Sequence, residues 1–196
     1  MTNCFFDTET TDVPYRNWNT SFIIQLGYVI ENNGNILDSN VFFVANQPPS
    51  KKAAQDIHKI SYIDLQTKGR PIKTVLLDFI KALDKYEVSN IITHSIPFDI
   101  GFILNECQRC GIDNNYWNKF NYYDTKKSCH YTPGEGGLAA CVKAPEGLMG
   151  RPHDALYDSY LCMELFRKTQ NKETMRAEKP PITILFERHK TTKKQY

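Results

Sequence analysis

The hydrophobic pattern of the chain changes near residue 45, and this change restricts the fold more than any other feature. Before it, apolar stretches predict strands at Cys4 to Asp7, Phe22 to Ile30 and Ile36 to Val44. The last two strands are joined by Asn32-Asn33-Gly34-Asn35, residue types that tolerate the positive φ of a hairpin turn. The chain is therefore expected to begin with a three-stranded antiparallel meander.

After the meander, helical and strand patterns alternate. Pro48-Pro49-Ser50 indicates a helix entry with Ser50 as the N-cap. Thr132 to Pro152 holds five of the ten glycines and is expected to be mostly loop, with a helical turn near Leu138 to Val142. The other expected elements are a helix at Thr74 to Tyr86, a strand at Ile91 to Thr93, a helix at Phe98 to Cys110 ending at Gly111, a strand at Asn121 to Asp124 and a helix at Ala155 to Lys168. This order predicts an α/β domain with a mixed sheet.

Length and charge limit the class of protein. A chain of 196 residues corresponds to one domain, and 24 basic against 22 acidic residues give a net charge of +2. This balance excludes a wholly basic nucleic-acid binder and an acidic disordered tail. Without a signal-like N-terminus or a long apolar run, we expect an intracellular, cytoplasmic protein whose six cysteines are reduced thiols.

Four acids occupy positions that the local pattern would otherwise fill with apolar residues. Asp7 and Glu9 are two residues apart at the end of the first strand, so their side chains share one face. Asp99 lies in the first turn of its helix, and Asp158 lies on the apolar stripe of the last helix. Each acid alone could be a helix cap or an ion-pair partner. Together they form the set of hard oxygen ligands that Mg²⁺ or Mn²⁺ requires.

His153 precedes Asp158 by five residues. On one helix the two side chains would lie roughly 140° apart, which is not one face. His153 is therefore expected on the loop before the helix, where its near-neutral unperturbed pKa suits a general base. The alternative is an exposed or structural histidine.

Three segments carry a family resemblance. They are Phe6-Asp7-Thr8-Glu9-Thr10-Thr11, His94-Ser95-Ile96-Pro97-Phe98-Asp99-Ile100-Gly101-Phe102 and His153-Asp154-Ala155-Leu156-Tyr157-Asp158. In this order they resemble the three motifs of the DnaQ-like (DEDDh) 3′–5′ exonuclease family, including its D-x-E and H-x-A-x-x-D patterns. Two lesser family features are similar to Ile23-Ile24-Gln25-Leu26-Gly27 and Ile57-His58-Lys59-Ile60. The family often has glycine at the position of Asp12 and asparagine at that of Ser95.

The resemblance implies an RNase H-like fold, with a five-stranded mixed sheet whose three N-terminal strands are antiparallel, flanked by helices. It also implies roles for individual residues. Two Mg²⁺ or Mn²⁺ ions per site would be held by Asp7, Glu9, Asp99 and Asp158. His153 would act as the general base. Contacts to the terminal nucleotide would come from Thr8, Thr10, Thr11 and Phe98.

The implied reaction is hydrolysis of phosphodiester bonds from a 3′ end, with release of nucleoside 5′-monophosphates. We expect a substrate of single-stranded DNA or frayed 3′ ends, in proofreading, repair or turnover, with a polymerase or another replication or repair protein as a candidate partner and no membrane. RNA is the alternative substrate, since the motifs do not include a 2′-hydroxyl contact. A binding module that has lost activity is a third reading, which the complete set of acids disfavours.

Residues 1–170 are expected to form the exonuclease domain and residues 171–196 a basic C-terminal extension. From Met163 onward there are nine basic and four acidic residues, so this end of the chain could bind phosphate in a salt-dependent way. Two other patterns leave alternatives open. Cys107-x-x-Cys110 with Cys129-His130 suggests zinc or buried thiols, and the aromatic residues from Tyr116 to Tyr123 suggest base stacking or core packing.

Overall fold

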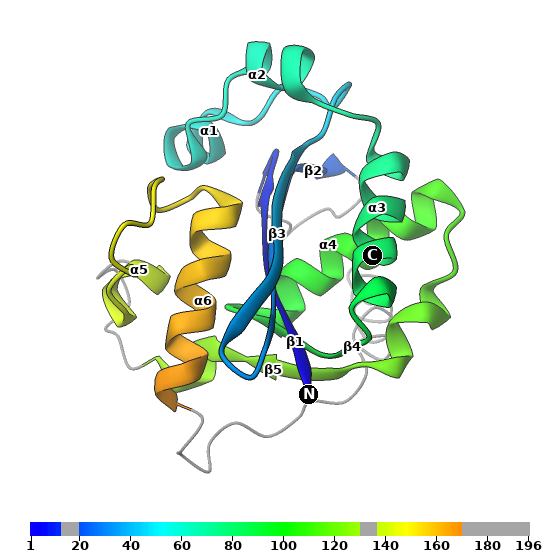
Figure 1. Cartoon of the computed structure of the whole chain (residues 1–196). Coiled ribbons are helices and arrows are strands. Elements are labelled where there is room, and N and C mark those ends of the chain that lie inside the picture. Colours follow the sequence, from blue (N-terminus) through cyan, green and yellow to red (C-terminus); the bar gives the residue numbers. More distant parts are fainter. Residues whose placement is uncertain (13–19, 130–136, 170–196) are drawn as a thin grey trace, which may run out of the picture.

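Within residues 1–12, 20–129 and 137–169, which the computed structural model describes, five strands form one mixed sheet (Figure 1). The strands are β1 (Thr2–Thr10), β2 (Ile23–Asn32), β3 (Asn35–Phe43), β4 (Val88–Thr93) and β5 (Asn121–Asp124). Their order is β3-β2-β1-β4-β5; β1, β2 and β3 are antiparallel, whereas β4 and β5 run parallel to β1. The predicted sheet is thus confirmed.

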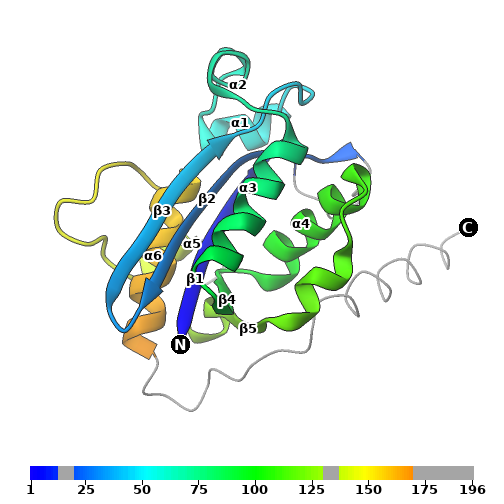
Figure 2. The ribbon, with the colours of Figure 1, turned by 45° about the vertical axis from the view of Figure 1, so that its right-hand side comes forward.

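Helices cover both faces of the sheet. The α-helices are α1 (Lys52–His58), α2 (Tyr62–Lys68), α3 (Ile72–Lys85), α4 (Ile96–Cys110), α5 (Gly137–Cys141) and α6 (Ala155–Thr169), and the 3-10 helices are η2 (Asn114–Lys119) and η3 (Thr125–Ser128). Figure 2 shows α3 and α4 on one side of the sheet and α6 on the other. Two hydrophobic clusters correspond to these two layers, one involving α3 and α4 and one involving α5 and α6.

The alternation of β1 determines which side chains meet which helices. Cys4 and Phe6 belong to the cluster with α3 and α4, whereas Phe5 packs against Phe166 of α6, with ring centroids 5.5 Å apart. Successive side chains of a strand point to opposite faces, so the odd-numbered residues of β1 face α6. Further along the strand, this places Asp7 and Glu9 on the side of α6.

The N-terminal end of α6 lies directly against β2 at Gly27. A Cβ at this position would lie 2.2 Å from Leu156 N and 2.3 Å from Ala155 C, so only glycine permits this approach. The Ser159 hydroxyl, one turn into α6, donates to the carbonyl oxygen of Gly27 at 2.9 Å. These contacts fix the start of α6 against the strand next to β1.

Several helix starts differ from the sequence-based expectation. The helices α3 and α4 each begin two residues earlier than expected, at Ile72 and Ile96. The N-cap of α1 is Lys51 and not Ser50, because the Lys51 N–H donates to Thr11 O at 2.9 Å and fixes the chain one residue later. The helix α2 was not predicted. It begins with a capping box in which the Ser61 hydroxyl accepts from Asp64 N at 3.0 Å and the Asp64 carboxylate accepts from Ser61 N at 3.2 Å.

The expectation that all six cysteines are reduced is wrong for one pair. The chain brings Cys129 and Cys141 to a Cα–Cα distance of 5.8 Å, within the range that a disulfide spans, and joins them. The other four cysteines are free. This pairing takes Cys129 out of the considered zinc set, and His130 lies outside the described residues.

The aromatic segment packs into the protein. Trp117 and Tyr122 are fully buried and Phe120 is nearly so, which supports core packing and not a stacking platform. None of the described helices has the length and apolar character needed to cross a membrane. The predicted extension, residues 171–196, lies outside the described part of the chain.

Candidate active site

Asp99 lies across the end of β1 from the two acids of that strand. It is buried in the first turn of α4, and its Oδ1 accepts hydrogen bonds from the Thr8 amide at 3.1 Å and the Thr8 hydroxyl at 2.9 Å. The first amides of α4 are satisfied differently, since the N–H groups of Phe98 and Asp99 donate to Ser95 O. The Asp99 carboxylate therefore faces β1 and does not cap its own helix.

The third part of the site comes from the start of α6. His153 lies before this helix, as expected, and adopts a left-handed conformation with a φ of 64°. Its N–H donates to Asp158 Oδ2 at 3.0 Å. One ligand atom each from Glu9, His153 and Asp158 lies within 4.8 Å of the others. Side chains from β1 and from the α6 segment, distant in sequence, thus converge.

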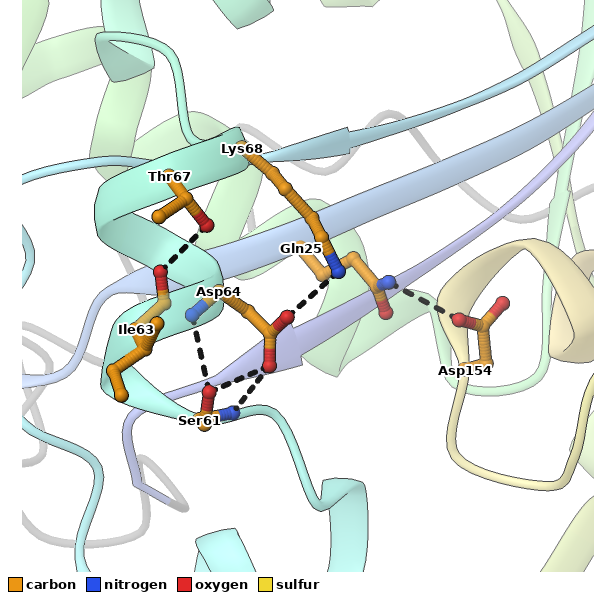
Figure 3. A network of polar contacts seen from close by, with 7 residues as sticks. All are labelled: Gln25, Ser61, Ile63, Asp64, Thr67, Lys68 and Asp154. Carbon is orange, nitrogen blue, oxygen red and sulfur yellow. Dashed lines mark hydrogen bonds and ion pairs between the residues drawn. The ribbon is translucent and has the colours of Figure 1, made fainter.

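Gln25 of β2 holds the α6 segment in place. Its side chain is buried, and Oε1 accepts from Ala155 N at 2.9 Å. Figure 3 shows the second contact, in which Nε2 donates to Asp154 Oδ2 at 3.2 Å. The other oxygen of Asp154 accepts from Tyr157 N at 3.2 Å, as an N-cap does. Because Gln25 pairs directly with Glu9 across β1 and β2, it links the α6 start to the strand that carries the acids.

Burial, reinforced by nearby negative charges, raises the pKa of each of the four acids. Desolvation is the largest cause in each case. It raises the pKa of Glu9 to about 8, that of Asp99 to about 7 and that of Asp158 to about 6. The pKa of Asp7 is raised well above its usual value, first by burial and then by the charges of Asp99, Glu9 and Asp158. These directions show that the carboxylates share one poorly solvated space.

The same acids fit a divalent metal ion. Within the described residues, none of Asp7, Glu9, Asp99 and Asp158 forms an ion pair with a basic side chain. Grouped carboxylates without a cation are costly, and carboxylate oxygens are the ligands that hard divalent cations prefer. These four carboxylates are therefore candidate ligands of a divalent cation.

His153 is suited to accept a proton. The residue is exposed at the edge of the cluster, and partial desolvation of its ring, followed by the positive charge of Arg151, lowers the pKa of the imidazole. A lowered pKa keeps the ring neutral near pH 7, and a neutral ring has a nitrogen available as a base. Its backbone bond to Asp158 keeps the ring beside the acids.

The hydroxyls of the three threonines predicted to contact substrate are engaged within the protein. Thr8 donates to Asp99, Thr10 Oγ1 donates to Asp12 O at 3.0 Å, and Thr11 Oγ1 accepts from Phe22 N at 3.0 Å. Phe98 is half-buried and lies edge-on to Phe102, with ring centroids 5.0 Å apart. The substrate contacts of these four residues stay predictions.

Sequence reasoning missed the positioning roles of Thr8 and Gln25. A signal existed for Gln25, which is the one amide inside the apolar run Ile23-Ile24-Gln25-Leu26-Gly27. A buried amide needs hydrogen-bond partners, so this position pointed to a polar contact. The partner, some 130 residues away in the sequence, was not predictable.

Comparison with known sequences identifies a family. The family model described as Exonuclease, RNase T type, matches residues 4–166. Ribonuclease T of Haemophilus influenzae is 30% identical over 109 residues, which are 55% of this chain and 48% of the relative. Ribonuclease T of Buchnera aphidicola is 34% identical over 85 residues, 42% of this chain and 38% of the relative. The matches thus span about half the length of these curated relatives or less.

Solved structures of nucleases share the fold. Escherichia coli exonuclease I in complex with a dT13 oligonucleotide superposes with a TM-score of 0.72 at 16% identity, covering 88% of this chain and 41% of that one. Cell-death related nuclease 4 gives a TM-score of 0.68 at 17% identity, covering 90% and 66%. The family match spans all three motifs, and these structures share the mixed sheet. The chain therefore belongs to the RNase T exonuclease family, within the DnaQ-like exonucleases of the RNase H-like superfamily.

Proposed function

We propose that this protein is a metal-dependent 3′–5′ exonuclease that hydrolyses single-stranded DNA or frayed 3′ ends and releases nucleoside 5′-monophosphates. The observation that carries the proposal is the convergence of Glu9, His153 and Asp158 from β1 and the α6 segment, with the buried Asp99 of α4 bonded to Thr8 of β1. Asp7, Glu9, Asp99 and Asp158 are its proposed metal ligands, and Mg²⁺ or Mn²⁺, two ions per site, is the proposed cofactor.

The proposed reaction divides the work among these side chains. When bound, two divalent cations polarise the phosphodiester and make the attacking water more acidic. The four carboxylates hold the charge that such cations neutralise. His153 takes the proton of the water as its oxygen bonds to phosphorus and the bond from phosphorus to the 3′ oxygen of the preceding nucleotide breaks. Glu9, beside His153, is proposed to contact the terminal 3′-hydroxyl.

RNA is the second candidate substrate, and a specific observation favours it. The curated relatives quoted above are ribonucleases T, and they match at a higher identity than the exonuclease I structures do. Support for DNA comes from the structure of exonuclease I bound to a dT13 oligonucleotide, because the fold of that enzyme matches most of this chain.

The test uses matched DNA and RNA oligonucleotides of one sequence, labelled at the 5′ end or the 3′ end, with Mg²⁺, Mn²⁺ or EDTA. A 3′–5′ exonuclease turns the 5′-labelled strand into a ladder that shortens with time and releases the 3′ label first as a mononucleotide. Blocking the 3′-hydroxyl with a phosphate should prevent this release. Loss of the 5′ label as a mononucleotide, or internal cuts in a circular strand, would contradict the proposal.

A further inference from the structure

Arg151 lies at the edge of the proposed active site, and neither the motifs nor the reaction above uses it. It is exposed and precedes His153 by two residues. Its positive charge partly offsets the rise that burial causes in the pKa of Glu9, and it adds to the lowering that burial causes in the imidazole pKa values of His153 and His58. The guanidinium therefore lies near the strand acid, the proposed base and the end of α1.

A neutral partner fixes the position of this guanidinium. Arg151 Nη2 donates to the carbonyl oxygen of His58, at the end of α1, at 2.6 Å. Among the described residues Arg151 forms no ion pair, whereas Arg70 and Arg167 both have acidic partners. A carbonyl leaves the positive charge uncompensated, and the guanidinium retains further N–H donors.

The loop that carries Arg151 is itself held against the protein. The Asp154 N–H donates to Arg151 O at 3.2 Å, and a Cβ at Gly150 would lie 3.1 Å from the ring of Tyr157. Two residues further on, the His153 amide is bonded to Asp158. The loop contacts hold the backbone of Arg151, and the His58 carbonyl holds its guanidinium. The side chain therefore loses little conformational freedom when it binds an anion, which favours affinity.

The geometry points to Arg151 as a binding residue for a phosphodiester oxygen of the substrate strand, beside the group that is hydrolysed. This inference rests on the proposed function. An arginine matches phosphate through paired N–H donors and carries a permanent charge. With divalent cations bound, the negative charge of the four acids would be neutralised. The positive charge of Arg151 would then attract the phosphates of the substrate strand and not the carboxylates.

The experiment measures binding of a fluorescent single-stranded oligonucleotide, with Ca²⁺ in place of Mg²⁺ to limit cleavage, over a series of salt concentrations. Each phosphate contact to a single strand contributes about 0.7 to the slope of log K against log salt. We expect Arg151→Gln to weaken binding about tenfold and to reduce the slope by about 0.7. Arg70→Gln is the matched control, because it removes the same charge beside Asp78 and Phe42, on the face of the sheet opposite α6, and should leave both values unchanged.

Arg151→Lys separates a phosphate contact from a structural role. It keeps the charge but loses the paired donors, so the salt slope should be retained while the KM for the oligonucleotide rises. If Arg151→Gln leaves the slope unchanged while the wild type binds and cuts, the inference is overturned and the proposed function stands. If the wild type neither binds nor cuts DNA or RNA with any metal, both are overturned.

Discussion

Thr8 donates two hydrogen bonds to one oxygen of Asp99, from its amide at 3.1 Å and its hydroxyl at 2.9 Å. Thr8 stands between the two acids of β1 but faces α4, because strand side chains alternate. The contact therefore joins the acid of the second motif to the strand of the first. Hydrogen bonds from Thr8 and Thr93 oppose the rise that burial causes in the pKa of Asp99.

Thr8→Val should weaken metal binding about tenfold, since partners that orient metal ligands typically contribute about 10–100-fold to affinity. The substitution removes the hydroxyl donor at nearly constant volume. Isothermal titration calorimetry with Mn²⁺ measures the metal affinity of each variant without any substrate. Thr8→Ser restores the donor and should bind nearly as the wild type does. Equal affinities of the valine variant and the wild type would show that the hydroxyl does not position Asp99.

Gln25→Leu should lower kcat about 10–100-fold, because displacement of the α6 start misplaces His153 and Asp158. Asn90→Leu is the matched control. Asn90 is a buried amide that donates to Asn3 at 2.8 Å and accepts from Asn121 at 3.1 Å, at the opposite end of β1. Both variants leave buried polar groups unpaired, so both should lose stability, by about 1–3 kcal/mol.

Only Gln25→Leu should increase amide hydrogen exchange in residues 153–158, and only it should reduce kcat beyond the loss explained by unfolding. Thermal melts establish that the two variants are comparably destabilised. A Gln25 variant with normal exchange in this segment and normal kcat would show that the buried amide supports the fold but not the geometry of the site.

Gly27→Ala should destabilise the protein by about 1–3 kcal/mol or more, because the added methyl meets the backbone of α6 and not a movable side chain. Displacement of α6 should also reduce turnover. Gly137→Ala is the control, since no atom lies within 4 Å of a Cβ at that position and its φ is not in the left-handed region. Denaturant unfolding of both variants measures the difference. Equal stabilities would contradict the close packing of α6 on β2.

The metal-free protein should become less stable as pH rises from about 6.5 to about 8, above the range in which the lowered pKa values of His58 and His94 act in the opposite direction. Burial raises the pKa of Glu9 from 4.5 to about 8 and that of Asp99 from 3.8 to about 7. Over this range the folded state holds protons that the unfolded state has lost, so the free energy of unfolding falls with pH. A bound cation replaces those protons, so the increase in Tm on adding Mg²⁺ should be larger at pH 8 than at pH 6.5.

Melting curves in EDTA and in Mg²⁺ at both pH values provide this comparison. Glu9→Gln cannot ionise, so its metal-free Tm should fall less between pH 6.5 and pH 8 than that of the wild type. A metal-free wild type that gains stability between pH 6.5 and pH 8 would show that the acids are solvated or paired with cations.

The candidate site residues that could be predicted from the sequence were those in unusual positions. Asp7, Glu9, Asp99 and Asp158 are acids within apolar patterns. The side-chain periods of a strand and of a helix predicted that they lie on inward faces. The 100° per residue of a helix also required His153 to precede α6, as it does. These inferences needed only local geometry, which the sequence contains.

What could not be predicted depends on contacts between distant segments. The partners of Gln25 are about 130 residues away, and Thr8 and Asp99 are 91 residues apart. The helix α1 begins one residue later than expected because Lys51 bonds to Thr11. The placement of α5 brings Cys141 to Cys129. Such contacts form only in the assembled fold, and no periodic pattern in the sequence indicates them.

The central claim is that the carboxylate cluster hydrolyses nucleic acid, and the release of nucleoside 5′-monophosphate by wild type and Asp7→Asn tests it most directly. The rate is measured with Mg²⁺ and a single-stranded oligonucleotide, with Asp56→Asn, an exposed acid paired with Lys52, as control. We predict that Asp7→Asn loses more than about 100-fold, beyond the effect of an orienting partner, and that Asp56→Asn retains the wild-type rate. An Asp7→Asn variant as active as the wild type would contradict the account.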